Sequence, residues 1–106
     1  MYLPEPLSDY FRAANAGNAD DASACFAADA VVHDEGEEHR GQAAIRDWLE
    51  EATRKYSPRA QVLMVTDDGK TTIVTAKVSG DFPGSPVELD YGFQIRGGLI
   101  SRLEIH

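Results

Sequence analysis

The sequence has a single cysteine, Cys25, so no disulfide can form within one chain. It is also poor in basic residues: it has 10 Lys and Arg but 18 Asp and Glu, and the formal net charge is -8. This negative charge opposes binding to a nucleic-acid backbone or to an anionic membrane surface. No apolar stretch is long enough to span a bilayer, and the first residues lack the pattern of a secretory signal. We therefore expect a cytoplasmic protein that binds neither nucleic acid nor membrane.

The rest of the composition is that of an ordinary globular domain. Hydrophobic residues make up 42% and charged residues 26% of 106 residues, which suits one domain, residues 1–106, around one core. Gly97-Gly98 is typical of a hairpin turn and Gly84 lies between prolines, so neither forms a phosphate-cradling loop. We expect no cofactor.

Helical periodicity dominates the first half of the chain. A first helix follows Pro4 and Pro6 and ends near Gly17, and Asn18 can cap a second one. A third helix begins at Gly41 and ends before residues 57–58. The apolar positions expected to face the core are Leu7, Tyr10, Phe11 and Ala14 in the first helix, Ala22, Cys25 and Phe26 in the second, and Ile45, Trp48, Leu49, Ala52 and Tyr56 in the third.

Strand patterns occupy residues 30–34, 61–66, 71–79, 87–96 and 99–105, with hairpin turns at residues 67–70 and 97–98. The order helix, helix, strand, helix and four antiparallel strands predicts an α+β domain, with helices covering one face of a curved antiparallel sheet. Several strands carry apolar residues on both faces. A second copy is the natural cover for the outer face, so we expect a homodimer through the sheet.

Two segments carry a family resemblance: FAADAVVHDEG at residues 26–36 and RGQAAIRDW at residues 40–48. With the element order, they resemble the SnoaL-like branch of the nuclear transport factor 2-like superfamily, which includes polyketide cyclases and ketosteroid isomerases. The resemblance implies a cone-shaped, cystatin-like fold of three helices against a bent sheet. It also implies a pocket for a small apolar molecule, although this fold hosts enzymes, scaffolds and transport factors alike.

The resemblance to ketosteroid isomerases assigns three catalytic roles. Asp34 falls where that family has its general base, and Tyr10 falls where it has the tyrosine of the oxyanion hole. Asp90 falls near the family's protonated aspartic acid. The implied chemistry is proton abstraction next to a carbonyl, followed by isomerisation or cyclisation. By strict alternation, however, Asp90 lies on the strand face opposite Tyr91 and Phe93.

Aromatic and aliphatic side chains could converge around Asp34 to form the walls of the pocket, with one histidine as a neighbour. The expected ligand-binding residues are Phe11, Phe26, Val32, His33, Trp48, Tyr56, Leu63, Tyr91 and Phe93.

Each assignment has a structural alternative. Asp34 could brace the turn at residues 35–36, and Tyr10 could be a core aromatic residue. The protein would then be a non-catalytic ligand-binding or protein-interaction module. His33, His39 and the acids between them suggest a metal site, but His33 and Asp34 point to opposite faces of a strand. A solvated acidic turn is the preferred interpretation, and we expect no metal.

Overall fold

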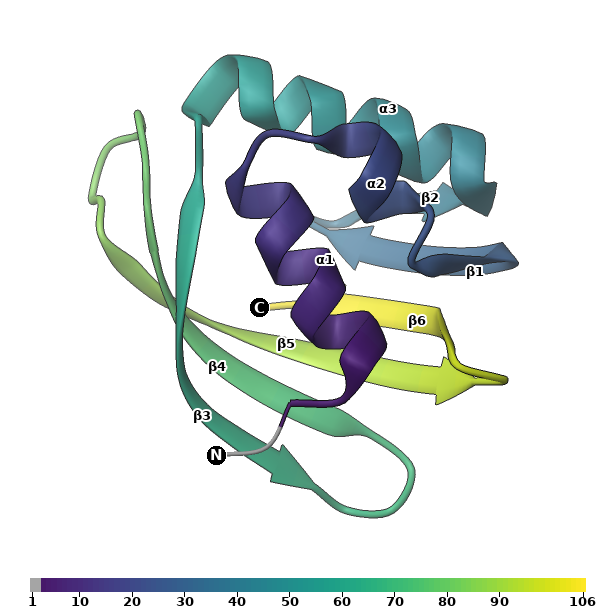
Figure 1. The fold of residues 1–106 in the computed structure, drawn as a ribbon. Coiled ribbons are helices and arrows are strands. Elements are labelled where there is room, and N and C mark those ends of the chain that lie inside the picture. Colours follow the sequence, from purple (N-terminus) through teal and green to yellow (C-terminus); the bar gives the residue numbers. More distant parts are fainter. Residues whose placement is uncertain (1–2) are drawn as a thin grey trace.

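The computed structural model describes residues 3–106, and it shows a six-stranded sheet curved around three helices (Figure 1). The α+β class and the cone-shaped architecture predicted from the sequence are confirmed. In chain order the elements are α1 (Glu5–Asn15), α2 (Ala19–Ser23), β1 (Phe26–Asp34), β2 (Glu37–Arg40), α3 (Gly41–Tyr56), β3 (Arg59–Asp67), β4 (Thr72–Ser79), β5 (Val87–Arg96) and β6 (Leu99–Ile105).

The helix ends follow local chemistry. Proline at the start of α1 fixes φ where a backbone N–H would have no partner. The Asn18 side chain caps α2 by accepting a hydrogen bond of 3.0 Å from the Asp21 N–H. The α3 helix ends at Tyr56 and is followed by Ser57, which adopts the left-handed conformation (φ 44°) and precedes a proline. These signals explain why the start of α2 and the end of α3 were predictable.

The sheet is mixed rather than purely antiparallel, which corrects the prediction. Its strand order is β2-β1-β6-β5-β4-β3, and β1 and β6 run parallel, with Val32 beside Leu103. All other neighbouring strands are antiparallel. Hairpin turns reveal antiparallel neighbours directly, whereas a parallel pair joins segments far apart in the chain and has no local turn signal.

One strand and one helix end also differ from the prediction. Strand β2 was not predicted, because its residues are all polar; Glu35 and Gly36 both have positive φ and form a tight hairpin that pairs β2 with β1. Helix α2 ends at Ser23, so Cys25 and Phe26 are not part of it, and Phe26 begins β1. The β1 strand is therefore longer than residues 30–34.

The core lies between the concave face of the sheet and the helices. Leu7 of α1 and Ile45 of α3 are fully buried against the sheet. Figure 1 shows α1 within the hollow of the curved sheet and α3 running above β1. The fully buried sheet residues include Val32, Val74, Phe93, Ile100 and Leu103. The inner face is therefore apolar, as a sheet covered by helices requires.

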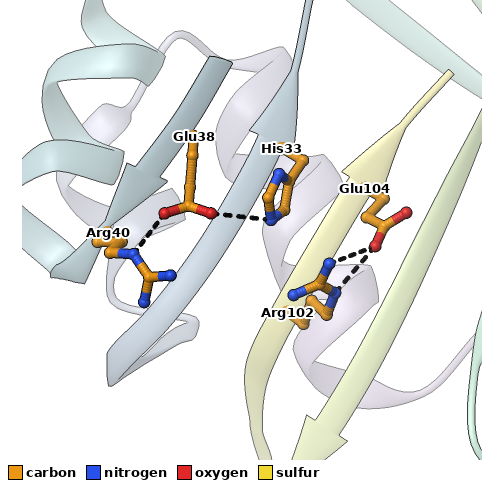
Figure 2. Close-up of polar contacts among 5 residues, drawn as sticks. All are labelled: His33, Glu38, Arg40, Arg102 and Glu104. Atoms are coloured by element: carbon orange, nitrogen blue, oxygen red, sulfur yellow. Dashed lines mark hydrogen bonds and ion pairs between the residues drawn. The ribbon is translucent and has the colours of Figure 1, made fainter. Parts of the chain in front are cut away.

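The outer face of β2, β1 and β6 carries charged side chains of both signs (Figure 2). Glu38 pairs with Arg40 and lies 3.4 Å, Oε1 to Nε2, from His33. On β6, the strand next to β1, Arg102 Nε donates to Glu104 Oε1 at 2.9 Å. These ion pairs are exposed, so each contributes little to stability. They place His33 on the outer face, away from the helices.

We expect the outer face to be covered by a second copy of the chain. Met64 of β3 and Ile73 of the adjacent β4 lie on this face and are 56% and 39% exposed, and a second copy would remove their apolar side chains from water. Sedimentation at micromolar concentration should show a species of about twice 11.6 kDa. Ile73→Asp should shift that species toward monomer, and a wild-type protein that sediments only as monomer would contradict the expectation.

Candidate active site

A cavity of about 660 Å³ opens between the concave sheet face, α1 and α3. Its walls are mainly aromatic and aliphatic, from α1, α3, strands β3 to β6 and the loop after β4. Three of the polar side chains in the lining are Asp34, Tyr10 and Tyr91. A concave apolar site with a few polar groups is the usual form of a small-molecule site.

Asp34 ends β1 and shares the inner strand face with the buried Val32. The indole Nε1–H of Trp48 donates to Asp34 Oδ2 at 3.1 Å. Trp48 is itself stacked on His39 of β2, with ring centroids 5.7 Å apart. Among residues 3–106 no buried side-chain oxygen lacks a partner, so the other carboxylate oxygen is open to the cavity or to solvent. The carboxylate is thus oriented by one bond and available at its second oxygen.

Tyr10 lies in the middle of α1, and its side chain is only 4% exposed. Its ring makes edge contacts with Phe26 and Phe93, at centroid distances of 5.6 and 5.8 Å. Tyr91 lies on the inner face of β5 and is 7% exposed. Both tyrosines line the cavity that Asp34 lines, so the structure brings together two phenols and one carboxylate.

Burial raises the pKa of both phenols. The pKa of Tyr91 rises to about 12, first because the ring is buried and then because the Asp34 charge opposes a second negative charge. The pKa of Tyr10 is also raised well above its usual range, by burial first and then by the charges of Tyr91 and Asp34. Both hydroxyls therefore stay protonated at neutral pH and can act as hydrogen-bond donors.

The raised pKa of Tyr91 makes stability depend on alkaline pH. The folded protein holds the phenolic proton more tightly than the unfolded chain, so this stability is complete below about pH 10 and is lost as pH rises toward 12. The free energy of unfolding should fall by about 2 to 3 kcal/mol more in wild type than in Tyr91→Phe across that interval. Guanidinium denaturation at several pH values measures both slopes, and equal slopes would contradict the prediction.

Four of the predicted wall residues line the cavity: Phe11, Trp48, Tyr56 and Tyr91. Five others do not. Three of these, Phe26, Val32 and Phe93, are fully buried and belong to the hydrophobic core. Phe26 and Phe93 shape the site indirectly, because the tyrosine rings pack on them.

Asp90, His33 and Leu63 lie outside the cavity. Asp90 is exposed on the outer face of β5 and accepts a hydrogen bond of 2.7 Å from Thr75 Oγ1, so it cannot serve as an inward-facing acid. His33 faces outward next to Glu38. Leu63 is 42% exposed at a bulge in β3, where an extra residue interrupts the alternation of faces.

Part of the cavity wall was not predicted from the sequence. Val87 and Leu89 precede Tyr91 at alternate positions, so the strand pattern contained that signal. Phe82 lies in an irregular loop and had no such signal. Its ring meets Tyr56 edge-on at 5.9 Å, and the neighbouring Asp81 N–H donates to the Tyr56 carbonyl at 2.7 Å. The loop is therefore held against the end of α3.

The loop approaches α3 so closely that Gly80 has no room for a side chain. A Cβ atom there would lie 2.6 Å from the Tyr56 carbonyl oxygen, well inside normal contact distance. This fixes the position of Phe82 at the cavity wall.

Within residues 3–106 no group of three His, Cys, Asp or Glu side chains is placed to hold a metal ion. Across the same residues, no helix combines the length and apolar character needed to cross a membrane.

This combination of a curved mixed sheet, three helices and a polar-tipped apolar cavity defines a class of cone-shaped α+β domains. The sequence profile of the SnoaL-like domain matches residues 7–103. The chain belongs to the SnoaL-like family. A search of curated protein sequences finds no match.

Several solved structures are similar to this chain. A candidate polyketide cyclase from Sinorhizobium meliloti is 48% identical, with a TM-score of 0.94, over 98% of this chain and 95% of that one. A candidate polyketide cyclase from Xanthomonas campestris is 25% identical, with a TM-score of 0.77, over 94% and 85%. A protein from Catenulispora acidiphila with a ketosteroid isomerase-like fold, solved with trimethylamine, is 19% identical, with a TM-score of 0.87, over 99% and 86%. At that identity the last comparison shows the fold alone.

Proposed function

We propose that this protein binds a small, largely apolar carbonyl compound in its inner cavity and transfers a proton next to the carbonyl group. It would act as a cofactor-free isomerase or cyclase. The observation that carries the proposal is the Asp34 carboxylate at the wall of an apolar cavity that Tyr10 also lines. The similarity to candidate polyketide cyclases supports the same reaction class.

In the proposed reaction, Asp34 removes a proton from the carbon next to the carbonyl. The electrons of the broken C–H bond form a carbon–carbon double bond, and the carbonyl oxygen becomes an enolate oxygen. The hydroxyl of Tyr10 donates a hydrogen bond to that oxygen as its charge develops. If the enolate is conjugated with a second double bond, protonated Asp34 then returns the proton to the far carbon, the carbonyl re-forms and the isomerisation is complete. Alternatively, the enolate carbon attacks a second carbonyl and closes a ring, the first carbonyl re-forms, and protonated Asp34 gives its proton to the new alkoxide oxygen.

One observation favours a second candidate, a non-catalytic binding module. The Trp48 indole already occupies one oxygen of Asp34, as expected if the carboxylate only braces β1 against α3. The cavity would still bind an apolar molecule, but no proton would move.

A panel of cyclic enones and aromatic ketones separates the two candidates. Trp48 is the only tryptophan and lines the cavity, so binding should change its fluorescence. Exchange of ligand protons for solvent deuterium, followed by NMR, reports proton transfer independently. Binding with accelerated exchange supports the enzyme. Binding without exchange by any member of the panel supports the binding module, and the absence of both overturns the proposal.

A further inference from the structure

Tyr10 and Tyr91 are held by the same two phenylalanine rings. Phe11 meets the edge of each tyrosine, with centroids 5.2 Å apart in both pairs. Phe93 lies 5.8 Å from Tyr10 and is stacked on Tyr91 at 6.1 Å with nearly parallel planes. The four rings form one cluster, here called the aromatic cluster, that joins α1 to β5. It places both phenols in the lining of one cavity.

Both phenolic hydroxyls are free to meet a ligand. Neither takes part in a hydrogen bond between residues 3–106, and that part of the chain has no buried side-chain oxygen without a partner. Because both rings are almost fully buried and both residues line the cavity, each hydroxyl opens onto the cavity. A buried tyrosine normally finds a hydrogen-bond partner, so two that lack one in the same cavity are both available as donors to a ligand there.

We propose that Tyr91 is a second catalytic donor, and that the carbonyl oxygen of the substrate accepts hydrogen bonds from Tyr91 and Tyr10 together. This inference rests on the function proposed above. It moves the second donor from Asp90, where the family resemblance placed it, to the next residue on the opposite face of β5. The substrate class is thereby narrowed to carbonyl compounds whose enolate oxygen can reach the aromatic cluster and accept two donors.

The charge balance fits this arrangement. Proton abstraction converts the Asp34 carboxylate to a neutral acid and creates one negative charge on the ligand oxygen. The total charge of the cavity is unchanged, and the new charge faces two neutral O–H dipoles instead of water. Hydrogen bonds to a charged atom are roughly twice as strong as those between neutral groups, so both phenols bind the enolate better than the ketone.

The test uses 4-nitrophenolate as a stable mimic of the enolate. The probe is added to the Asp34→Asn variant, because its neutral amide imitates the protonated acid. We expect binding with a shift of the visible absorption band. Tyr91→Phe and Tyr10→Phe, each added to this background, should weaken affinity by about 10-fold or more, since each removes one donor to a charged oxygen. Phenylalanine keeps the ring and therefore the packing of the aromatic cluster.

A third variant, Asp90→Asn in the same background, tests the position from which the role was moved. It should bind the probe within about two-fold of the parent, because its side chain lies on the outer face. Equal affinity with and without the Tyr91 hydroxyl would overturn the assignment, as would failure of Asp34→Asn to bind the probe at all, or a loss on Asp90→Asn as large as that on Tyr91→Phe. Deuterium exchange by the wild type is measured separately, so a failure of the proposed reaction can be distinguished from a failure of the Tyr91 assignment.

Discussion

Replacing Asp34 with asparagine is expected to slow deuterium exchange of a bound ketone by about 10³-fold, within the range typical of a general base. Asparagine has nearly the same shape, and its carbonyl oxygen can still accept the hydrogen bond from Trp48. It has no basic lone pair at neutral pH, however, so it cannot accept the proton that Asp34 removes. The rate is measured by NMR on the ligand that exchanges fastest with wild type.

Asp29→Asn is a matched control for this experiment. Asp29 lies on the same strand, but it is exposed and pairs with Arg96, 2.9 Å from Nη2 to Oδ1. Its replacement removes the same charge and leaves the cavity intact, so exchange should be unchanged. Exchange that survives in Asp34→Asn would show that Asp34 is not the base. Ligand affinity measured for both variants separates a loss of chemistry from a loss of binding.

Elements with a strong periodic signal were predictable from the sequence. The apolar stripe of α3 includes Ile45 and Leu49, and both are buried as its helical spacing requires. In β5, Tyr91 and Phe93 alternate with exposed or half-exposed residues, as the period of two requires. Such signals are local: each depends only on neighbours within the same element. The parallel pairing of β1 with β6 depends on the whole chain, and it could not be predicted in this way.

The site was predictable where the alternation of side chains along a strand determines which face of the sheet a residue points to. Asp34 is two residues from the buried Val32, so it faces inward, and the same rule turns Asp90 away from Tyr91. The family resemblance suggested Asp90 because it compares positions along the chain, whereas the face of a strand changes at every residue. The prediction for Leu63 was wrong for a different reason: its strand is apolar on both faces, and Leu63 lies at a bulge in β3 that interrupts the alternation of faces.

Phe93→Ala should be among the most destabilising substitutions in the chain, because Phe93 is fully buried and supports both tyrosines of the aromatic cluster. Removal of a core phenylalanine costs about 3 to 5 kcal/mol, which is a large part of the 5 to 15 kcal/mol that stabilises a typical domain. Urea denaturation followed by circular dichroism measures the loss. At temperatures where the variant remains folded, affinity for an apolar ligand should also fall, because Tyr10 and Tyr91 lose the ring that they share.

Ile95→Ala provides the comparison on the same strand. Ile95 is 36% exposed, so its truncation removes less buried area and leaves no enclosed cavity, and the expected cost is about 1 kcal/mol. A cost for Phe93→Ala no larger than this would mean that the inner face of β5 is loosely packed. In that case the aromatic cluster could not hold the two phenols in fixed positions, and Tyr10 and Tyr91 could not donate together to one ligand oxygen.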